Sequence, residues 1–257
     1  MADEILCTIH DHIATITLNR PEKRNALNSA ALQELSATVA SLEDHPDVRV
    51  VVIRGAGKAF SSGRDLREMG QQQAAGEAPP VDIVEVFHAI EALRHPTIAM
   101  VHGDALAGGC ELALHCDLRI ASEAARFGMP LARLGLVVPF ELTCKLVEVI
   151  GPAHTRHLLF SAQPVDGKRA LEMGMVHEVV PAADLERATY DLARRIAANA
   201  PLALAGIKAT LQRIVTPCQQ IAHDDIDTLA QRARQSADAR EGVRAMLEKR
   251  PPVFRGA

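Results

Sequence analysis

The sequence predicts an α/β fold that ends in a run of helices. Before Ala182, short apolar runs that are typical of buried strands, such as Val48–Arg54 and Thr97–Val101, alternate with segments of helical periodicity. From Ala182 onward only the helical periodicity remains. Because the composition also changes near residue 200, we expect a core over residues 1–199 and a helical region over residues 200–257.

Two periodicities assign the elements in chain order. Alternating or continuous apolar runs predict strands at 5–18 (two strands around a turn at 11–12), 48–54, 97–101, 117–121 and 176–180. Apolar residues every three or four positions predict helices at 28–44, 82–93, 141–150, 155–160, 166–173, 184–199, 202–215 and 219–249. Asp65 is expected to cap a further helix, whereas Gln71–Pro80 lacks an apolar period and is expected to form a mobile surface loop. Phe127–Pro130 is expected to form a turn.

Composition excludes several classes of function. A net charge of −4 and an aromatic content of 3% without Trp argue against a nucleic-acid partner. No apolar run approaches the roughly 20 residues of a membrane span, and the acidic N-terminus is unlike a signal peptide. Five cysteines, an odd number in apolar stretches, fit buried reduced thiols in a cytoplasmic protein better than disulfides or a metal site: Cys7, Cys110, Cys116, Cys144 and Cys218.

The stretch 102–117, which reads HGDALAGGCELALHCD, organises the rest of the chain. The apolar run at 97–101 leads into a turn of small residues, and a helical segment follows. Gly108 near the helix start offers a backbone amide that has no partner within the helix. Glu111 follows about one helical turn, or roughly 5 Å, later. An amide donor and a carboxylate thus lie within reach of one carbonyl substrate.

A second strand–turn–helix unit at 60–66 repeats this pattern. The amides of Arg64 and Gly108 would together form an oxyanion hole for an ester or thioester oxygen. A purely structural interpretation stays open for each residue. The glycines also suit close packing of a helix on a strand, Glu111 also suits an exposed first helical turn, and Asp65 also suits a plain N-cap.

Six segments together carry a resemblance over essentially the whole chain. They are NRPEKRNALN, AFSSGRDL, HGDALAGGCELALHCDLRIA, QPVD, ALEMGMVHEVVP and EKRPPVFRG. In this order and spacing they resemble the enoyl-CoA hydratase/isomerase (crotonase) family. The resemblance implies a crotonase-type spiral of ββα turns with a C-terminal helical trimerisation region, assembled as a homotrimer or a dimer of trimers. It also implies an acyl-CoA thioester as substrate, with coenzyme A as part of that substrate and no further cofactor.

The resemblance assigns roles residue by residue. The amides of Arg64 and Gly108 would bind the thioester oxygen. The loop at 19–28 would lie near the CoA phosphates and adenine, although its cations are equally suited to a solvated loop. Tail residues Lys249, Arg250 and Phe254 would complete the site of a neighbouring subunit. The substrate-binding candidates are Lys23, Arg24, Ala26, Ser62, Asp65, Leu66, Leu131 and Phe254.

The chain departs from the family pattern at two positions. Hydration in this family usually uses two glutamates; Glu111 matches the first, but Leu131 occupies the position of the second and cannot transfer a proton. Glu141 is a possible substitute, or else a first-turn carboxylate that favours the helix dipole. Arg64 stands where a small residue is common. Its side chain would bind an acyl carboxylate, line the CoA channel or simply be exposed.

We therefore expect an enoyl-CoA hydratase-type lyase of fatty acid metabolism, with Glu111 as acid and base. The alternatives are double-bond isomerisation, decarboxylation or thioester hydrolysis with Glu111 or Glu141, and a CoA-thioester-binding protein with little turnover. His102 and His115 flank the central stretch and are expected to be structural.

Overall fold

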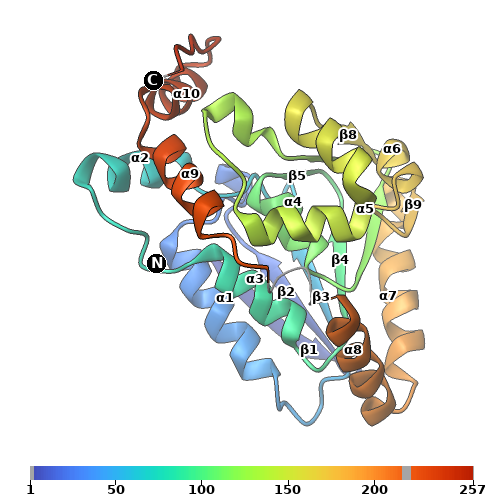
Figure 1. Cartoon of the computed structure of the whole chain (residues 1–257). Helices are drawn as coiled ribbons and strands as arrows, with labels where there is room; N and C mark the ends of the chain where they lie inside the picture. The colour runs from blue at the N-terminus through green and yellow to red at the C-terminus, as the bar shows by residue number, and fades with distance from the viewer. Residues whose placement is uncertain (1–2, 216–220, 257) are drawn as a thin grey trace.

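The computed structural model describes residues 3–215 and 221–256, and it places two sheets among helices (Figure 1). The larger sheet has the order β1-β2-β3-β4-β6-β9, in which only the β1–β2 pair is antiparallel. Its strands are β1 Ile5–His10, β2 Ile13–Leu18, β3 Val50–Gly55, β4 Thr97–Val101, β6 Leu118–Ser122 and β9 Glu178–Val180. The smaller sheet pairs β5 Asp104–Leu106, β7 Arg126–Gly128 and β8 Val165–Asp166 in that order.

Helices cover both faces of the larger sheet. The α-helices are α1 Ser29–Leu42, α2 Leu66–Ala75, α3 Ile83–Ala92, α4 Gly108–Leu114, α5 Phe140–Ser161, α6 Gly167–Glu172, α7 Leu185–Ala197, α8 Pro201–Val215, α9 Asp224–Gln235 and α10 Ala237–Glu248. Short 3-10 helices are η1 Pro21–Lys23, η2 Pro130–Leu134 and η3 Ala182–Asp184. In the part of the chain that is described, no helix is both long and apolar enough to cross a membrane.

The alternating directions of the side chains along β3 explain why helices pack on both faces of the larger sheet. Val50 and Val52 pack with α7 residues such as Leu185 in one apolar cluster, whereas Val51 and Ile53 pack with α1 and α3 in the other. Successive side chains of a strand point to opposite faces, so a continuous apolar run is what a sheet covered on both sides requires. The α/β prediction and the strands at 5–18, 48–54, 97–101, 117–121 and 176–180 are thus confirmed, with ends shifted by a few residues.

The predicted loop at Gln71–Pro80 is wrong for its first half. α2 continues through Ala75 and ends at Gly76, which has a left-handed φ of +69°. Asp65 caps this helix, since its carboxylate accepts hydrogen bonds from the amides of Arg67 and Glu68. Gln and Ala have high helix propensity, so a capped exposed helix forms here without an apolar stripe.

Three further expectations need correction. Phe127–Pro130 is not simply a turn, because its first two residues belong to β7. The helix predicted at 219–249 is two helices, because Ser236 leaves the helical conformation and accepts a hydrogen bond from the Ala239 amide as the N-cap of α10. Its predicted start at residues 219–220 and Cys218 lie outside the described residues. Cys7 is exposed rather than buried, while Cys110 and Cys116 are buried free thiols.

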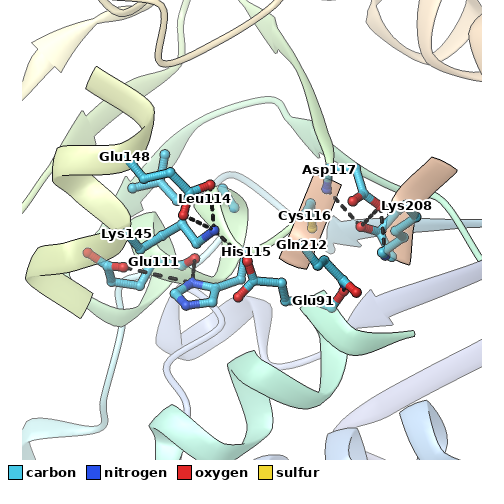
Figure 2. Close-up of polar contacts among 12 residues, drawn as sticks. Glu91, Glu111, Leu114, His115, Cys116, Asp117, Lys145, Glu148, Lys208 and Gln212 are labelled. Carbon is cyan, nitrogen blue, oxygen red and sulfur yellow. Dashed lines mark hydrogen bonds and ion pairs between the residues drawn. The ribbon is translucent and has the colours of Figure 1, made fainter. Parts of the chain in front are cut away.

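The C-terminal helices contact the core of the same chain. A Cβ atom on Gly242 of α10 would lie 2.5 Å from the backbone of Leu134, and one on Gly135 would lie 2.8 Å from the backbone of Asp238. α10 and η2 therefore pack backbone against backbone. On α8, the buried Lys208 ammonium lies 2.8 Å from a carboxylate oxygen of Asp117, which ties that helix to the start of β6 (Figure 2).

Candidate active site

Glu111 lies in the first turn of α4 with its side chain completely enclosed. Both carboxylate oxygens are buried and have no hydrogen-bond partner. Burial raises the pKa of Glu111 well above its usual value, and the nearby Lys145 ammonium offsets this only in part. An unpartnered buried carboxyl group is costly to the fold, which favours a functional role over the exposed first-turn role. Solvent does not reach this carboxyl group, because its side chain is fully buried.

Two tight turns bring the amides of Arg64 and Gly108 together. Ser61 and Ala105 form a parallel bridge that aligns the two segments. Gly63 has a φ of +84°, and a Cβ atom there would lie 2.7 Å from the Gly108 nitrogen. A Cβ atom on Gly108 would in turn lie 3.7 Å from the Arg64 nitrogen. Only glycine allows this close approach of two backbones.

These two amides are free to bind a ligand. Within residues 3–215 and 221–256, neither the Arg64 nor the Gly108 N–H donates a hydrogen bond to another protein group. Ala107, the residue before α4, has φ 49° and ψ −123°, a conformation that is strained for alanine. Such strain at a helix start next to a free amide is typical of a functional turn.

The loop at 19–28 packs along the same turn. The Leu27 amide donates to the Gly63 carbonyl at 2.7 Å, and the Asp65 amide donates to the Leu27 carbonyl at 3.0 Å. Ala26 is buried in this contact, and the Ser62 amide donates to the Arg24 carbonyl. Lys23 and Arg24 are exposed beside it. The structure thus places these candidates next to the amide pair, and their CoA contact stays a prediction.

A partly buried polar network lies beside Glu111, and the sequence alone did not predict it (Figure 2). His115 Nδ1 donates to the Glu111 carbonyl oxygen at 2.8 Å and lies 3.8 Å from the Glu111 carboxylate. The Lys145 ammonium contacts Glu91 at 2.5 Å and Glu148 at 2.8 Å. Burial lowers the pKa of His115 to about 3, so this imidazole is neutral at physiological pH.

One corner of this network gathers potential metal ligands. Ligand atoms of His88, Glu91 and His115 lie within 4.8 Å of one another, and the Nε2 atoms of both histidines are buried without a partner. Glu91, however, is already paired with the Lys145 ammonium.

The spacing of Lys145 and Glu148 along one helix is visible in the sequence. Their contact with residues of α3 and α4 depends on the fold, so the sequence alone could not predict it.

The remaining candidates take other positions. Glu141 lies in the first turn of α5, where its carboxylate contacts the His223 imidazole at 3.2 Å. Leu131 lies in η2 and packs against the main core. Leu66 is the first residue of α2. The tail around Phe254 follows α10 rather than approaching Glu111, because the Arg255 amide donates to Asp238 of that helix.

Comparison with known proteins relates the whole chain to one family. A model of the enoyl-CoA hydratase/isomerase family matches residues 8–257. The short-chain-enoyl-CoA hydratase of Clostridium acetobutylicum is 38% identical over 204 residues, covering 78% of each chain. The crotonyl-CoA hydratase of Syntrophomonas wolfei is 34% identical over 259 residues, covering 98% of each chain. A solved structure of methylmalonyl-CoA decarboxylase complexed with 2S-carboxypropyl-CoA superposes with a TM-score of 0.91 at 28% identity, covering 100% of both chains.

Proposed function

The chain belongs to the enoyl-CoA hydratase/isomerase family, and on this premise we propose that it is an acyl-CoA lyase that adds water to a 2-enoyl-CoA. The observation that carries the proposal is the buried, unpartnered Glu111 carboxyl group one helical turn past the free Gly108 amide. The relatives named for enoyl-CoA and crotonyl-CoA hydration support the same reaction.

The proposed mechanism uses one carboxylate and two amides. The oxygen of a water molecule bonds to the β-carbon of the enoyl thioester, and the electrons of the double bond move toward the thioester oxygen. The Arg64 and Gly108 amides donate hydrogen bonds to the resulting enolate oxygen. Glu111 takes a proton from the water and delivers it to the α-carbon, so its charge is restored at the end of the cycle. Because burial favours the protonated form of Glu111, hydration should speed up as pH rises through its pKa.

Decarboxylation of a 2-carboxyacyl-CoA is a second candidate, favoured by Leu131 and by the solved decarboxylase of similar fold. In this reaction the bond between the α-carbon and the carboxylate breaks and carbon dioxide leaves. The electrons of that bond form a thioester enolate, which the same two amides would hold; protonated Glu111 gives its proton to the α-carbon and is then protonated again from solvent. No second carboxylate is needed, which suits leucine at position 131. The reaction uses the acid form of Glu111, so its rate should fall as pH rises.

Assembly and location complete the proposal. We place the chain in a homotrimer or a dimer of trimers in the cytoplasm, with no cofactor beyond the coenzyme A of its substrate. Support for assembly comes from α8, which exposes four large apolar side chains: Leu202, Ile207, Leu211 and Ile214. By helical spacing, Ile207, Leu211 and Ile214 share one face of α8, and an exposed apolar stripe of this kind is typical of a protein–protein interface. Sedimentation of the purified chain would measure the oligomeric state.

The test supplies crotonyl-CoA and methylmalonyl-CoA separately over a range of pH. Loss of the enoyl-thioester absorbance measures hydration, and carbon dioxide release measures decarboxylation. We expect hydration whose rate rises with pH. If the chain releases carbon dioxide at a rate that falls as pH rises, and does not hydrate crotonyl-CoA, then decarboxylation rather than hydration is its reaction. Binding of both thioesters without change in either would contradict the proposed catalysis.

A further inference from the structure

The side chain of Arg64 is a partly buried cation without a counter-ion. Its Nε atom is buried and has no hydrogen-bond partner. Among residues 3–215 and 221–256, no carboxylate lies within 4.0 Å of its guanidinium group. Burial lowers the pKa of Arg64, which reflects the cost of holding this charge away from water. Charged groups in such places are normally paired, so the arrangement calls for an anion.

The acidic groups nearest Arg64 are engaged elsewhere. Glu68 accepts hydrogen bonds from the Ser29 amide with both oxygens, at 2.9 and 3.2 Å. Asp65 caps α2 and contacts Arg20, and Asp82 caps α3.

Glu68, Asp82 and Asp65 favour the charge of the guanidinium from a distance, but none of them contacts it. Nη2 of Arg64 has a weak contact of 3.4 Å with the Gln72 side-chain oxygen. Arg234 of α9 is close enough to disfavour the charge of Arg64 further. The polar groups on the packed elements therefore leave Nε of Arg64 free for another acceptor.

The position of Arg64 specifies where that acceptor comes from. The backbone amide of the same residue lies beside the Gly108 amide, where the proposed thioester oxygen binds. The side chain extends from this point between α2 and the start of α3, as its nearest charged and polar groups show. The pantetheine arm separates the CoA phosphates from the thioester, so the anion expected nearest to Arg64 is one that the acyl group carries close to its carbonyl.

We propose that Arg64 binds a free carboxylate on the acyl group, so that the substrates are CoA thioesters of dicarboxylic acids. This inference rests on the proposed acyl-CoA function but not on which reaction follows. A guanidinium group is always charged and presents paired N–H donors that match a carboxylate, so arginine suits this role. The carboxylate would supply the partner that Nε lacks.

The experiment compares binding of matched saturated thioesters, freshly prepared and without an enoyl double bond to hydrate, by calorimetry. Glutaryl-CoA and pentanoyl-CoA have acyl chains of equal length, and only the first carries a terminal carboxylate. Succinyl-CoA with butyryl-CoA, and adipyl-CoA with hexanoyl-CoA, extend the series to shorter and longer chains. Contacts to coenzyme A cancel within each pair. A charge-assisted hydrogen bond should make the carboxylated member of the best pair bind about tenfold or more tightly.

Arg64→Met and Arg67→Met provide the matched variants. Arg67 is exposed on the first turn of α2, so its loss should leave the preference unchanged. Arg64→Met should abolish or reverse the preference, and Arg64→Gln repeats the test if the first variant does not fold. Equal binding of both members of every pair by the wild type would overturn the inference. A preference that survives in Arg64→Met would also overturn it. A preference found without turnover of any enoyl-CoA would refute hydration while leaving the role of Arg64 intact.

Discussion

Replacing Glu111 by leucine should stabilise the protein while abolishing catalysis. Both carboxylate oxygens of Glu111 are buried without a partner, and leucine fills a similar volume with no polar atom. Leaving a polar group unsatisfied in the interior costs about 1–3 kcal/mol. In a chain of this size each kcal/mol shifts Tm by about 2–4 °C, so we expect Glu111→Leu to raise Tm by roughly 2–12 °C.

The pH dependence of this gain follows from the raised pKa of Glu111. Above the usual pKa of 4.5, the unfolded chain releases the proton while the folded chain keeps it. The unfolded state then binds fewer protons, so wild-type stability falls as pH rises toward the folded-state pKa. The advantage of Glu111→Leu should therefore be small near pH 4 and larger at pH 7.

Thermal unfolding of the wild type and the variant at these two pH values is the assay. Glu148→Leu is the control, because its carboxylate is paired with Lys145 at 2.8 Å and its loss should lower Tm. A Tm for Glu111→Leu that is below the wild type at pH 7 would refute the idea that this carboxyl group is held at a cost to the fold.

Three further changes test other residues of the proposed site. Gly63→Ala should lower the free energy of unfolding by about 1–3 kcal/mol and reduce the hydration rate, because its Cβ would lie 2.7 Å from the Gly108 nitrogen. Gly76→Ala is the control: Gly76 also has a positive φ, but a Cβ there would meet nothing within 4 Å, so only stability should change. Leu131→Glu should raise the hydration rate if the missing carboxylate limits it, and an unchanged rate in the folded variant would indicate a reshaped pocket instead. His115→Met should reduce the loss of stability on acidification, measured by denaturant unfolding, because between pH 6.5 and about 3 only the unfolded chain protonates this histidine; an unchanged acid response would contradict its neutral buried state.

Much of the larger sheet and its covering helices could be predicted from periodicity. Continuous apolar runs such as Val48–Arg54 predict buried strands when they are bounded by turns. Asn28 and Ser29 both offered a cap for α1, and Asn28 is the one that caps it. β5 and β7 could not be found this way, because each has three residues and shows no period. α2 was missed beyond Asp65 because its helix is set by propensity and capping rather than by an apolar face.

The close approach of the Arg64 and Gly108 backbones was predictable, because it depends on local backbone chemistry, whereas the roles of these residues stay predictions. Gly63 and Gly108 indicated that two backbone segments approach each other closely. The helical spacing from Gly108 then placed Glu111 about one turn further along the helix. The unpaired charge of Arg64 was not predictable, because it depends on Glu68 and Asp82 making hydrogen bonds elsewhere. The contact between Glu141 and His223 was likewise hidden, since the two residues are 82 positions apart in the chain.

The measurement that tests the central claim most directly is the rate of crotonyl-CoA hydration by the wild type beside Glu111→Gln. Glutamine keeps the shape of the side chain but cannot exchange a proton. If Glu111 is the proton-transfer group, the variant should lose at least ~10²-fold in kcat while still binding the thioester. A variant that keeps a rate near the wild type would show that the proton is handled by another group and that the assignment of Glu111 is wrong.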